Sequence, residues 1–344
     1  MAPPQLSSLS PSDTVIKLPH PYHTAYTVQK SSDALFRIEP SSSSKAQPPV
    51  QLHNADLLFT EPTDLRSSEL PSPSNNGPWA RARRSPAVAA SWSSGSSAPT
   101  LAQAWLLLYV LFTVRPSMET LRLELKGKDA TLLAAQLKDV LLATAHPELP
   151  PSLASSKQPD TSADVVVLAL RSTFWQGAGS PFGPRPVWLP AESPSSLVNP
   201  LSSYPLTPVE HTITVAGAGD PQDPERYQQS YHPIRPAKPA PGAVVYSRWI
   251  PHLGEEFSMV SLDWQDEEHL NLFHTWQNDP RVSQGWNETG TLEQHREYLR
   301  KIHVDPHQVA LLAKWDDAYF AYFEVYWAKV RRDSFTALSV RDTR

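Results

Sequence analysis

The sequence of 344 residues contains no cysteine. Disulfides, thiolate metal sites and cysteine nucleophiles are therefore excluded, and the redox compartment stays open. Glycine is also scarce, with 12 residues, whereas proline is abundant, with 36. Each proline within an element removes a backbone donor and interrupts a helix or a central strand, so this composition excludes one uninterrupted globule.

The chain also lacks an excess of positive charge, because 30 lysines and arginines stand against 35 acidic residues, for a net charge of −5. This balance gives no basic field for a nucleic-acid partner. The histidines do not follow the HExxH spacing of a metalloprotease, and no metal is expected. The most apolar run, residues 101–114, is shorter than the roughly 17 to 25 residues of a membrane span. With no secretory signal at the N-terminus, we expect a cytoplasmic protein without a membrane span.

Hydrophobic residues nevertheless make up 40% of the chain, which is too many for a wholly disordered protein. The prolines cluster, and the clusters suggest where the folded parts begin and end. We expect a disordered tail (residues 1–12), a first folded unit (13–190) with a Ser-, Pro- and Ala-rich disordered insertion (67–98), a proline-rich linker (191–242) and a second folded unit (243–329).

Hydrophobic periodicity predicts an α+β fold for both units. In the first unit it predicts helices at residues 99–114 and 129–145 and strands at 119–125 and 164–172. In the second it predicts strands at 244–251, 256–263, 308–315 and 318–329, a helix at 266–279, and a further helix capped by Thr289 or Thr291. Pro280 is expected to end the first of these two helices.

The last predicted strand carries a candidate acid or base. Strict alternation would place Tyr322, Glu324 and Tyr326 on one face, and Tyr319 and Phe323 on the other. A carboxylate between two phenols in an aromatic setting is a plausible proton acceptor or donor. The alternative is a glutamate on the solvated face of a hairpin, which spacing alone favours.

A second candidate is the segment HTWQNDPRVSQGW, residues 274–286. His274 and Asn278 are four residues apart on one helix face, where both can bond to a polar ligand. Arg281 adds a charge at the helix end, and Trp286 a flat apolar wall. A lone histidine on a helix is more often structural, and nearby His295, His303 and His307 fit no familiar metal-ligand spacing.

Three segments together resemble a known family: HTWQNDPRVSQGW (274–286), GTLEQHREYL (290–299) and YFEVYWAK (322–329). With residues 248–263, they resemble the siderophore-biosynthesis N-acyltransferases of the GNAT superfamily. This family includes hydroxylysine acetyltransferases and the fungal hydroxyornithine acyl- and transacylases. The resemblance covers residues 246–329, roughly a quarter of the chain.

The resemblance implies two GNAT-like units, each a mixed sheet with flanking helices, joined by the proline-rich linker. It implies transfer of an acyl group from acyl-CoA to the N-hydroxylated side-chain amine of ornithine or lysine. Carried over by position, the catalytic residues would be Glu324 and His274. The substrate-binding residues would be Asn278, Arg281, Trp286, Tyr326 and Trp327.

The family pattern continues with a further strand and a helix whose glycine-rich N-terminus cradles the CoA pyrophosphate. No such turn follows Lys329, where residues 330–344 run VRRDSFTALSVRDTR. We therefore expect an incomplete second unit, a non-homologous tail at residues 330–344 and no CoA-binding motif, with catalysis impaired. A retained intron or an early-stopping gene model would explain such an ending, and the alternative is a genuinely divergent C-terminus.

Two functional classes stay open. One is an enzyme of hydroxamate siderophore assembly, and the other is a non-catalytic GNAT-like fragment that acts as an interaction module. The acyl group, the choice between ornithine and lysine, and the oligomeric state are not readable from the sequence. Some relatives are peroxisomal, so that location is open for full-length forms.

Overall fold

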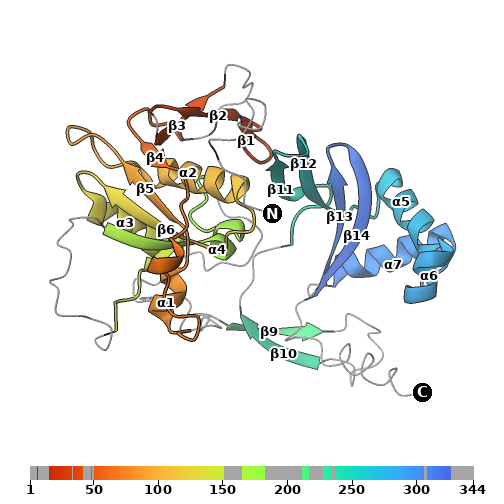
Figure 1. The fold of residues 1–344 in the computed structure, drawn as a ribbon. Coiled ribbons are helices and arrows are strands. Elements are labelled where there is room, and N and C mark those ends of the chain that lie inside the picture. Colours follow the sequence, from red (N-terminus) through yellow and green to blue (C-terminus); the bar gives the residue numbers. More distant parts are fainter. Residues whose placement is uncertain are drawn as a thin grey trace. The chain divides into compact units, whose positions relative to one another are not determined.

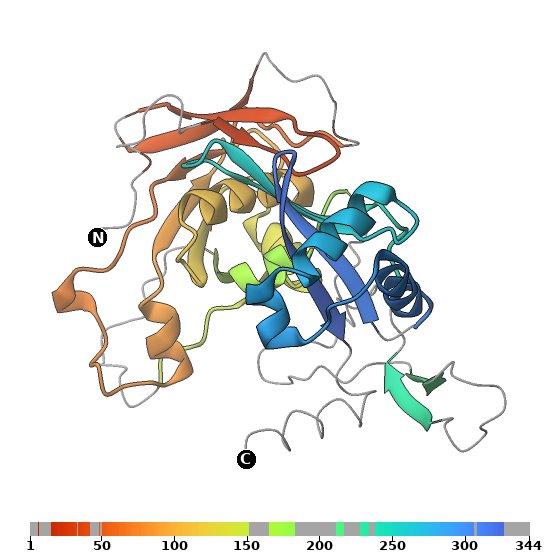
Figure 2. The same ribbon diagram turned by 90° about the vertical axis from the view of Figure 1, so that its right-hand side faces the viewer.

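The computed structural model describes residues 6, 15–32, 34–41, 48, 50–150, 165–182, 211–216, 228–233, 238–305 and 308–326. The chain divides into two compact units, residues 1–206 with 249–254 and residues 207–248 with 255–344. Each unit combines sheet and helix, so the predicted α+β class is confirmed (Figure 1, Figure 2). Among the described residues, no helix is long and apolar enough to cross a membrane.

An eight-stranded mixed sheet forms the centre of the first unit, in the order β1-β2-β3-β4-β5-β6-β8-β7. Only the β5–β6 pair is parallel among its described ladders. The strands are β1 (Val15–Lys17), β2 (Ala25–Lys30), β3 (Leu35–Pro40), β4 (Leu58–Thr60), β5 (Ala87–Ser91), β6 (Thr120–Lys126), β7 (Ala143–Ala145) and β8 (Val165–Leu170).

The prediction of a disordered insertion at residues 67–98 is wrong. It holds a short 3-10 helix (Ser67–Glu69), helix α1 (Pro78–Arg83) and strand β5, which pairs with β4 and β6 inside the sheet. Val88 and Ala90 of β5 are 0% and 1% exposed. Small side chains are enough to form a strand here, because the neighbouring strands on both sides satisfy the hydrogen bonds of the β5 backbone. The composition of the segment does not reveal this stabilisation.

The long helix of the first unit is α2 (Leu101–Val114), close to its predicted bounds. It begins with a capping box, in which Thr100 and Gln103 satisfy each other's backbone N–H groups. Every residue from Ala104 to Val114 is buried, so α2 lies in the core.

Helix α3 (Ala130–Asp139) is shorter than the helix predicted at residues 129–145. It ends because Leu141 has a φ of 62°, in the left-handed region that helices do not continue through. The chain then pairs as β7 with β8, after which α4 (Arg171–Trp175) follows.

The second unit is built on a four-stranded sheet in the order β11-β12-β13-β14. Helices α5 and α7 lie on one side of β13 and β14, with α6 beyond α5 (Figure 1). The strands are β11 (Val244–Ile250), β12 (Glu255–Ser261), β13 (Gln308–Trp315) and β14 (Ala318–Tyr326), and the helices are α5 (Glu267–Gln277), α6 (Pro280–Trp286) and α7 (Leu292–Val304). The helix-to-sheet core contains Leu270, Phe273, Leu299, Ile302 and Leu312.

The stretch expected as a linker, residues 191–242, contains two further strands. They are β9 (His211–Ala216) and β10 (Gln228–Pro233), which pair antiparallel as a separate two-stranded sheet. The rest of that stretch, up to residue 237, and the tail at residues 330–344 lie outside the described residues.

Local caps explain where the three helices of the second unit begin. The carboxylate of Asp266 accepts from the backbone N–H of His269 at the start of α5. Asp279 does the same for Arg281, and Pro280 occupies the first position of α6, a helix that the sequence prediction missed. Thr291, one of the two predicted caps, begins α7 with Gln294 in a capping box.

A β-bulge changes which side chains share a face of β14. Ala313 pairs with Ala321 but Lys314 pairs with Tyr319, so Phe320 is an extra residue between them. Tyr319 and Tyr322 therefore both pack against the helix-facing core, and their predicted placement on opposite faces is wrong. Phe320 contacts Phe257 and Trp315 instead.

Lys238 closes the C-terminal end of α7. Its ammonium donates to the carbonyl oxygens of Ile302, His303 and Asp305, at 2.9, 2.7 and 2.9 Å. These carbonyls have no partner within the helix, and a cation is favourable at this end of the helix dipole. Burial lowers the pKa of the Lys238 ammonium, and Asp305 acts in the opposite direction.

We expect Lys238→Met to destabilise the second unit by about 1.5–3 kcal/mol, because three charge-assisted hydrogen bonds are lost. Urea unfolding followed by circular dichroism measures this change. The control is Lys301→Met, which removes an exposed charge from the same last turn of α7. Equal losses in the two variants would contradict the capping role.

Candidate active site

Glu324 lies on the helix-facing side of β14, clamped by two phenols. Tyr322 of the same strand donates to its Oε1 at 2.6 Å, and Tyr298 of α7 donates to the same oxygen at 2.7 Å. The pKa of Tyr322 is raised well above its ordinary value, mainly by burial and secondly by the adjacent Glu324 carboxylate. The phenol therefore stays protonated and acts as a donor. The predicted Tyr322–Glu324 neighbourhood is thus present, and the glutamate does not stand free on a solvated face.

His274 lies on α5, where its imidazole meets that of His295 on α7. The two Nδ1 atoms are 2.9 Å apart, and Nε2 of His295 is 2.9 Å from the carbonyl oxygen of Glu288. The carbonyl can only accept, so Nε2 of His295 carries a proton. With His295 neutral, its Nδ1 accepts the proton of His274 Nδ1. The amide nitrogen of Asn278 is also 3.1 Å from Nδ1 and 3.5 Å from Nε2 of His274, but its two N–H groups are directed at the carbonyl oxygens of His274 and Gly290. We therefore assign Nδ1 of His274 as the donor to His295, which makes Nε2 its basic atom.

Asn278 holds the loop before α7 against the end of α5. Its side-chain amide donates to the carbonyl oxygens of His274 and Gly290, both at 3.0 Å, and its Oδ1 accepts from Gly290 N–H at 3.1 Å. A Cβ on Gly290 would lie 3.1 Å from Nε2 of His295, so glycine permits this close approach. Both faces of the Asn278 amide are therefore used within the protein.

We expect Asn278→Ala to destabilise the second unit by about 2 kcal/mol, because two hydrogen bonds to the Gly290 backbone are lost. Thermal unfolding with a urea titration measures the change. Asn271→Ala is the matched control, since Asn271 is an exposed residue of the same helix. An unchanged stability in Asn278→Ala would show that this amide is free to serve a ligand.

The ring of Phe273 lies between the two predicted catalytic residues. It contacts His295 edge-on, with ring centroids 5.3 Å apart, and stacks on Tyr298 at 5.8 Å. It also meets Tyr322 at 4.8 Å. The structure therefore places His274 and Glu324 in one aromatic cluster, and no hydrogen bond joins them among the described contacts.

Two of the other predicted residues lie away from this cluster. Arg281 is exposed and pairs with Asp279, whose pKa the guanidinium lowers to about 2. Trp286, at the end of α6, is 74% exposed. Tyr326 ends β14 and is also exposed, and Trp327 lies outside the described residues.

Two contributors were missed by the sequence prediction, namely Tyr298 as a partner of Glu324, and His295 as a partner of His274. Both lie on the side of α7 that carries buried Leu299 and Ile302, and His295 was considered in the sequence only as a metal ligand. A third pair, His269 and Tyr319, is structural. The Nδ1 of His269 accepts from Asp263 N–H, so its Nε2–H donates to the Tyr319 hydroxyl at 3.0 Å.

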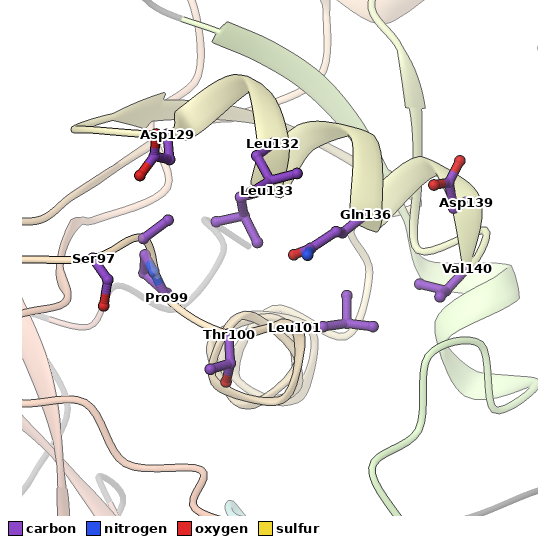
Figure 3. A pocket seen from close by; sticks show the side chains of 11 residues that line it. Ser97, Pro99, Thr100, Leu101, Asp129, Leu132, Leu133, Gln136, Asp139 and Val140 are labelled. Atoms are coloured by element: carbon purple, nitrogen blue, oxygen red, sulfur yellow. The ribbon is translucent and has the colours of Figure 1, made fainter.

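A hollow of about 450 Å³ lies in the first unit, between α3 and the start of α2 (Figure 3). It is mostly apolar, with Leu101, Leu133 and Val140 among its walls and the carboxylates of Asp129 and Asp139 near its two ends. Those carboxylates disfavour a polyanion such as CoA. None of the predicted site residues lines it. Nor do three or more potential metal ligands cluster anywhere in the part of the chain that the structure describes.

Comparison with known proteins identifies the family. Residues 265–337 match the family described as an Acetyltransferase (GNAT) domain, a stretch that includes α5 to β14 and runs past Lys329. An N(5)-hydroxyornithine:cis-anhydromevalonyl coenzyme A-N(5)-transacylase of Beauveria bassiana is 68% identical over 95% of this chain and 73% of its own length. The chain belongs to the siderophore N-acyltransferases of the GNAT superfamily.

Other members are more distant. A hydroxyornithine transacylase of Ajellomyces capsulatus is 46% identical over 92% of this chain and 71% of its own. An N(6)-hydroxylysine O-acetyltransferase of Escherichia coli is 31% identical over 46% and 39% of the two chains. Acyltransferases of the GNAT superfamily use acyl-CoA as the acyl donor.

Proposed function

We propose that this protein is an acyl-CoA-dependent N-acyltransferase of hydroxamate siderophore biosynthesis, with N5-hydroxyornithine as the acceptor. Membership of the family supports the reaction type. The higher identity to hydroxyornithine transacylases than to the hydroxylysine enzyme supports the acceptor. The observation that carries the proposal at the site is the clamped carboxylate of Glu324, which the ring of Phe273 connects to the paired imidazoles of His274 and His295. The proposed location is the cytoplasm, with peroxisomes as the alternative.

In the proposed reaction the hydroxylamine nitrogen of the acceptor attacks the thioester carbonyl. A C–N bond forms, the C–S bond breaks, and the proton leaves the nitrogen while the CoA sulfur becomes a thiol. The products are a hydroxamate and free CoA. A hydroxylamine is largely neutral at pH 7, so the protein needs to orient the two substrates and to move one proton.

Glu324 and His274 are the proposed groups that handle this proton. No described residue donates to Oε2 of Glu324, and Nε2 of His274 has a long contact of 3.5 Å with the amide nitrogen of Asn278. Either can accept from the nitrogen or donate toward the leaving sulfur. The proposed substrate-binding residues are Asn278, which acts by holding the loop before α7, and Arg281, Trp286, Tyr326 and Trp327, of which exposed Trp286 offers an apolar surface.

For the architecture we propose that residues 13–190 form a degenerate GNAT-like unit and that residues 243–329 contribute the N-terminal half of the catalytic GNAT unit. The mixed sheet of the first unit and the antiparallel sheet with α5 and α7 of the second support this division. Acyl-CoA is the proposed co-substrate.

A second candidate is a non-catalytic interaction module. Its support is the apolar surface of β14, the last strand of the described sheet, on which Phe323, Val325 and Tyr326 are exposed. In addition, β14 has a partner strand on one side only among the described residues, and the backbone of such an edge strand is suited to pairing with another chain.

The decisive experiment incubates the protein with acyl-CoA and N5-hydroxyornithine and detects the product as its coloured ferric complex, with CoA binding measured by calorimetry. An N-acyl product binds Fe³⁺ as a hydroxamate, whereas an O-acyl ester does not. Hydroxamate formation supports the proposal. Formation of the ester would show that the acyl group goes to the hydroxylamine oxygen and not to the nitrogen. If neither product forms and CoA does not bind, the interaction module is the better account.

A further inference from the structure

The Glu324 carboxylate is held asymmetrically. Both phenols donate to Oε1, from two different elements, Tyr322 on β14 and Tyr298 on α7. No described residue donates to Oε2. Two donors on one oxygen fix the rotation of the carboxylate, so the direction in which Oε2 faces is determined by the protein.

Of the two donors, Tyr298 is the one that links the helix layer to the strand. Tyr322 shares β14 with Glu324, two residues away, and therefore moves with it. The ring of Tyr298 stacks on Phe273 with an interplanar angle of 13° and centroids 5.8 Å apart, and Phe273 is 1% exposed. The phenol is thus set by the core and not by the strand that carries the carboxylate.

The helix that carries Tyr298 is itself fixed at both ends. Thr291 and Gln294 form the capping box at its start. Lys238 donates to the carbonyl oxygens of Ile302 and His303 in its last turn and to that of Asp305 just after it. Leu299, next to Tyr298, is 1% exposed and belongs to the core. The position of the Tyr298 hydroxyl is therefore well defined before any substrate binds, which is the condition for preorganisation.

We propose that Tyr298 is a positioning residue that orients Glu324, so that Oε2 faces the acceptor nitrogen. This inference rests on the proposed function. Tyr298 itself touches no reacting atom and acts only through the carboxylate. A misoriented carboxylate keeps its charge but loses its alignment, and the cost of such a loss falls on the chemical step.

The test is a double-mutant cycle in hydroxamate formation. Tyr298→Phe is expected to lower kcat about 10-fold in the wild-type background, the size of one charge-assisted hydrogen bond. In the Glu324→Gln background the same change is expected to cost less than about 2-fold, because no proton acceptor remains to be oriented. A structural role would give the same factor in both backgrounds, and that result would overturn the proposal.

Tyr319→Phe is the matched control. Its hydroxyl bonds to His269 and not to Glu324, although the ring packs against the same core. We expect less than about 2-fold loss in this variant. If Tyr319→Phe and Tyr298→Phe lose activity equally, the orienting role is wrong.

A readout without turnover separates this inference from the proposed function. In urea unfolding, the effects of Tyr298→Phe and Glu324→Ala are expected to be non-additive, since the two side chains share one hydrogen bond. Additive effects would show that the clamp does not exist in solution. A coupled pair in a wild-type protein that makes no hydroxamate would instead refute the proposed function and leave the clamp in place.

Discussion

Glu324→Gln is expected to lower the rate of hydroxamate formation by about 10²- to 10⁴-fold, the range that a positioned general base contributes. Glutamine is nearly isosteric, and its carbonyl oxygen can still accept from Tyr298 and Tyr322. The clamp and the fold should therefore survive, while the group that accepts a proton is lost. Steady-state kinetics with the ferric hydroxamate assay measures the loss, and an unchanged melting temperature shows that it is chemical.

Glu297→Gln is the matched control for this change. Glu297 lies on α7 and pairs with Arg300 at the surface, away from the cluster around Phe273. It should retain full turnover. If Glu324→Gln also retained full turnover, Glu324 would be a structural acceptor for two phenols and nothing more.

The strand that carries Glu324 shows how much the alternation of side chains predicts about which residues share a face. Alternation along residues 322–326 correctly placed Tyr322 beside Glu324, because the ladder to β13 is regular there. It failed at Tyr319, because Phe320 is inserted as a bulge opposite the Ala313–Lys314 step. A bulge depends on the pairing of two strands, so one strand read alone cannot reveal it.

The missed partners have a related cause. Tyr298 and His295 lie on the face of α7 that also carries buried Leu299 and Ile302, so their spacing indicates a packed helix face. Which polar atom each one meets depends on β14 and α5, which are distant in sequence. Strand β5 was missed for the opposite reason, since its composition is that of a loop and only its place between β4 and β6 makes it a strand.

The local signals were read more successfully. Thr291 does cap α7, and α2 begins and ends near its predicted bounds. Asp279 and Pro280 form an equally good start signal, with a capping carboxylate and proline at the first helical position. There the proline was taken as the end of α5, although it also begins α6.

His274→Ala carries the second large expected effect, a fall in hydroxamate formation of about 10²-fold. The carbonyl of Glu288 determines which nitrogen of His295 is protonated, and His295 in turn directs the Nδ1 proton of His274. Nε2 of His274 is left as the basic atom, oriented by a chain that begins at the backbone. Removing the ring removes that atom without touching the carboxylate clamp.

Added imidazole should restore part of the activity of His274→Ala, because a small base can enter the space left by the ring and accept the proton. His303→Ala, which changes an exposed histidine of α7, should behave as the wild type with or without imidazole. The pattern of rescue decides the role. Recovery confined to His274→Ala and saturating with imidazole marks a proton-transfer group. A variant that is inactive, folded and not rescued would mean that His274 serves to hold its neighbours, with proton transfer left to Glu324.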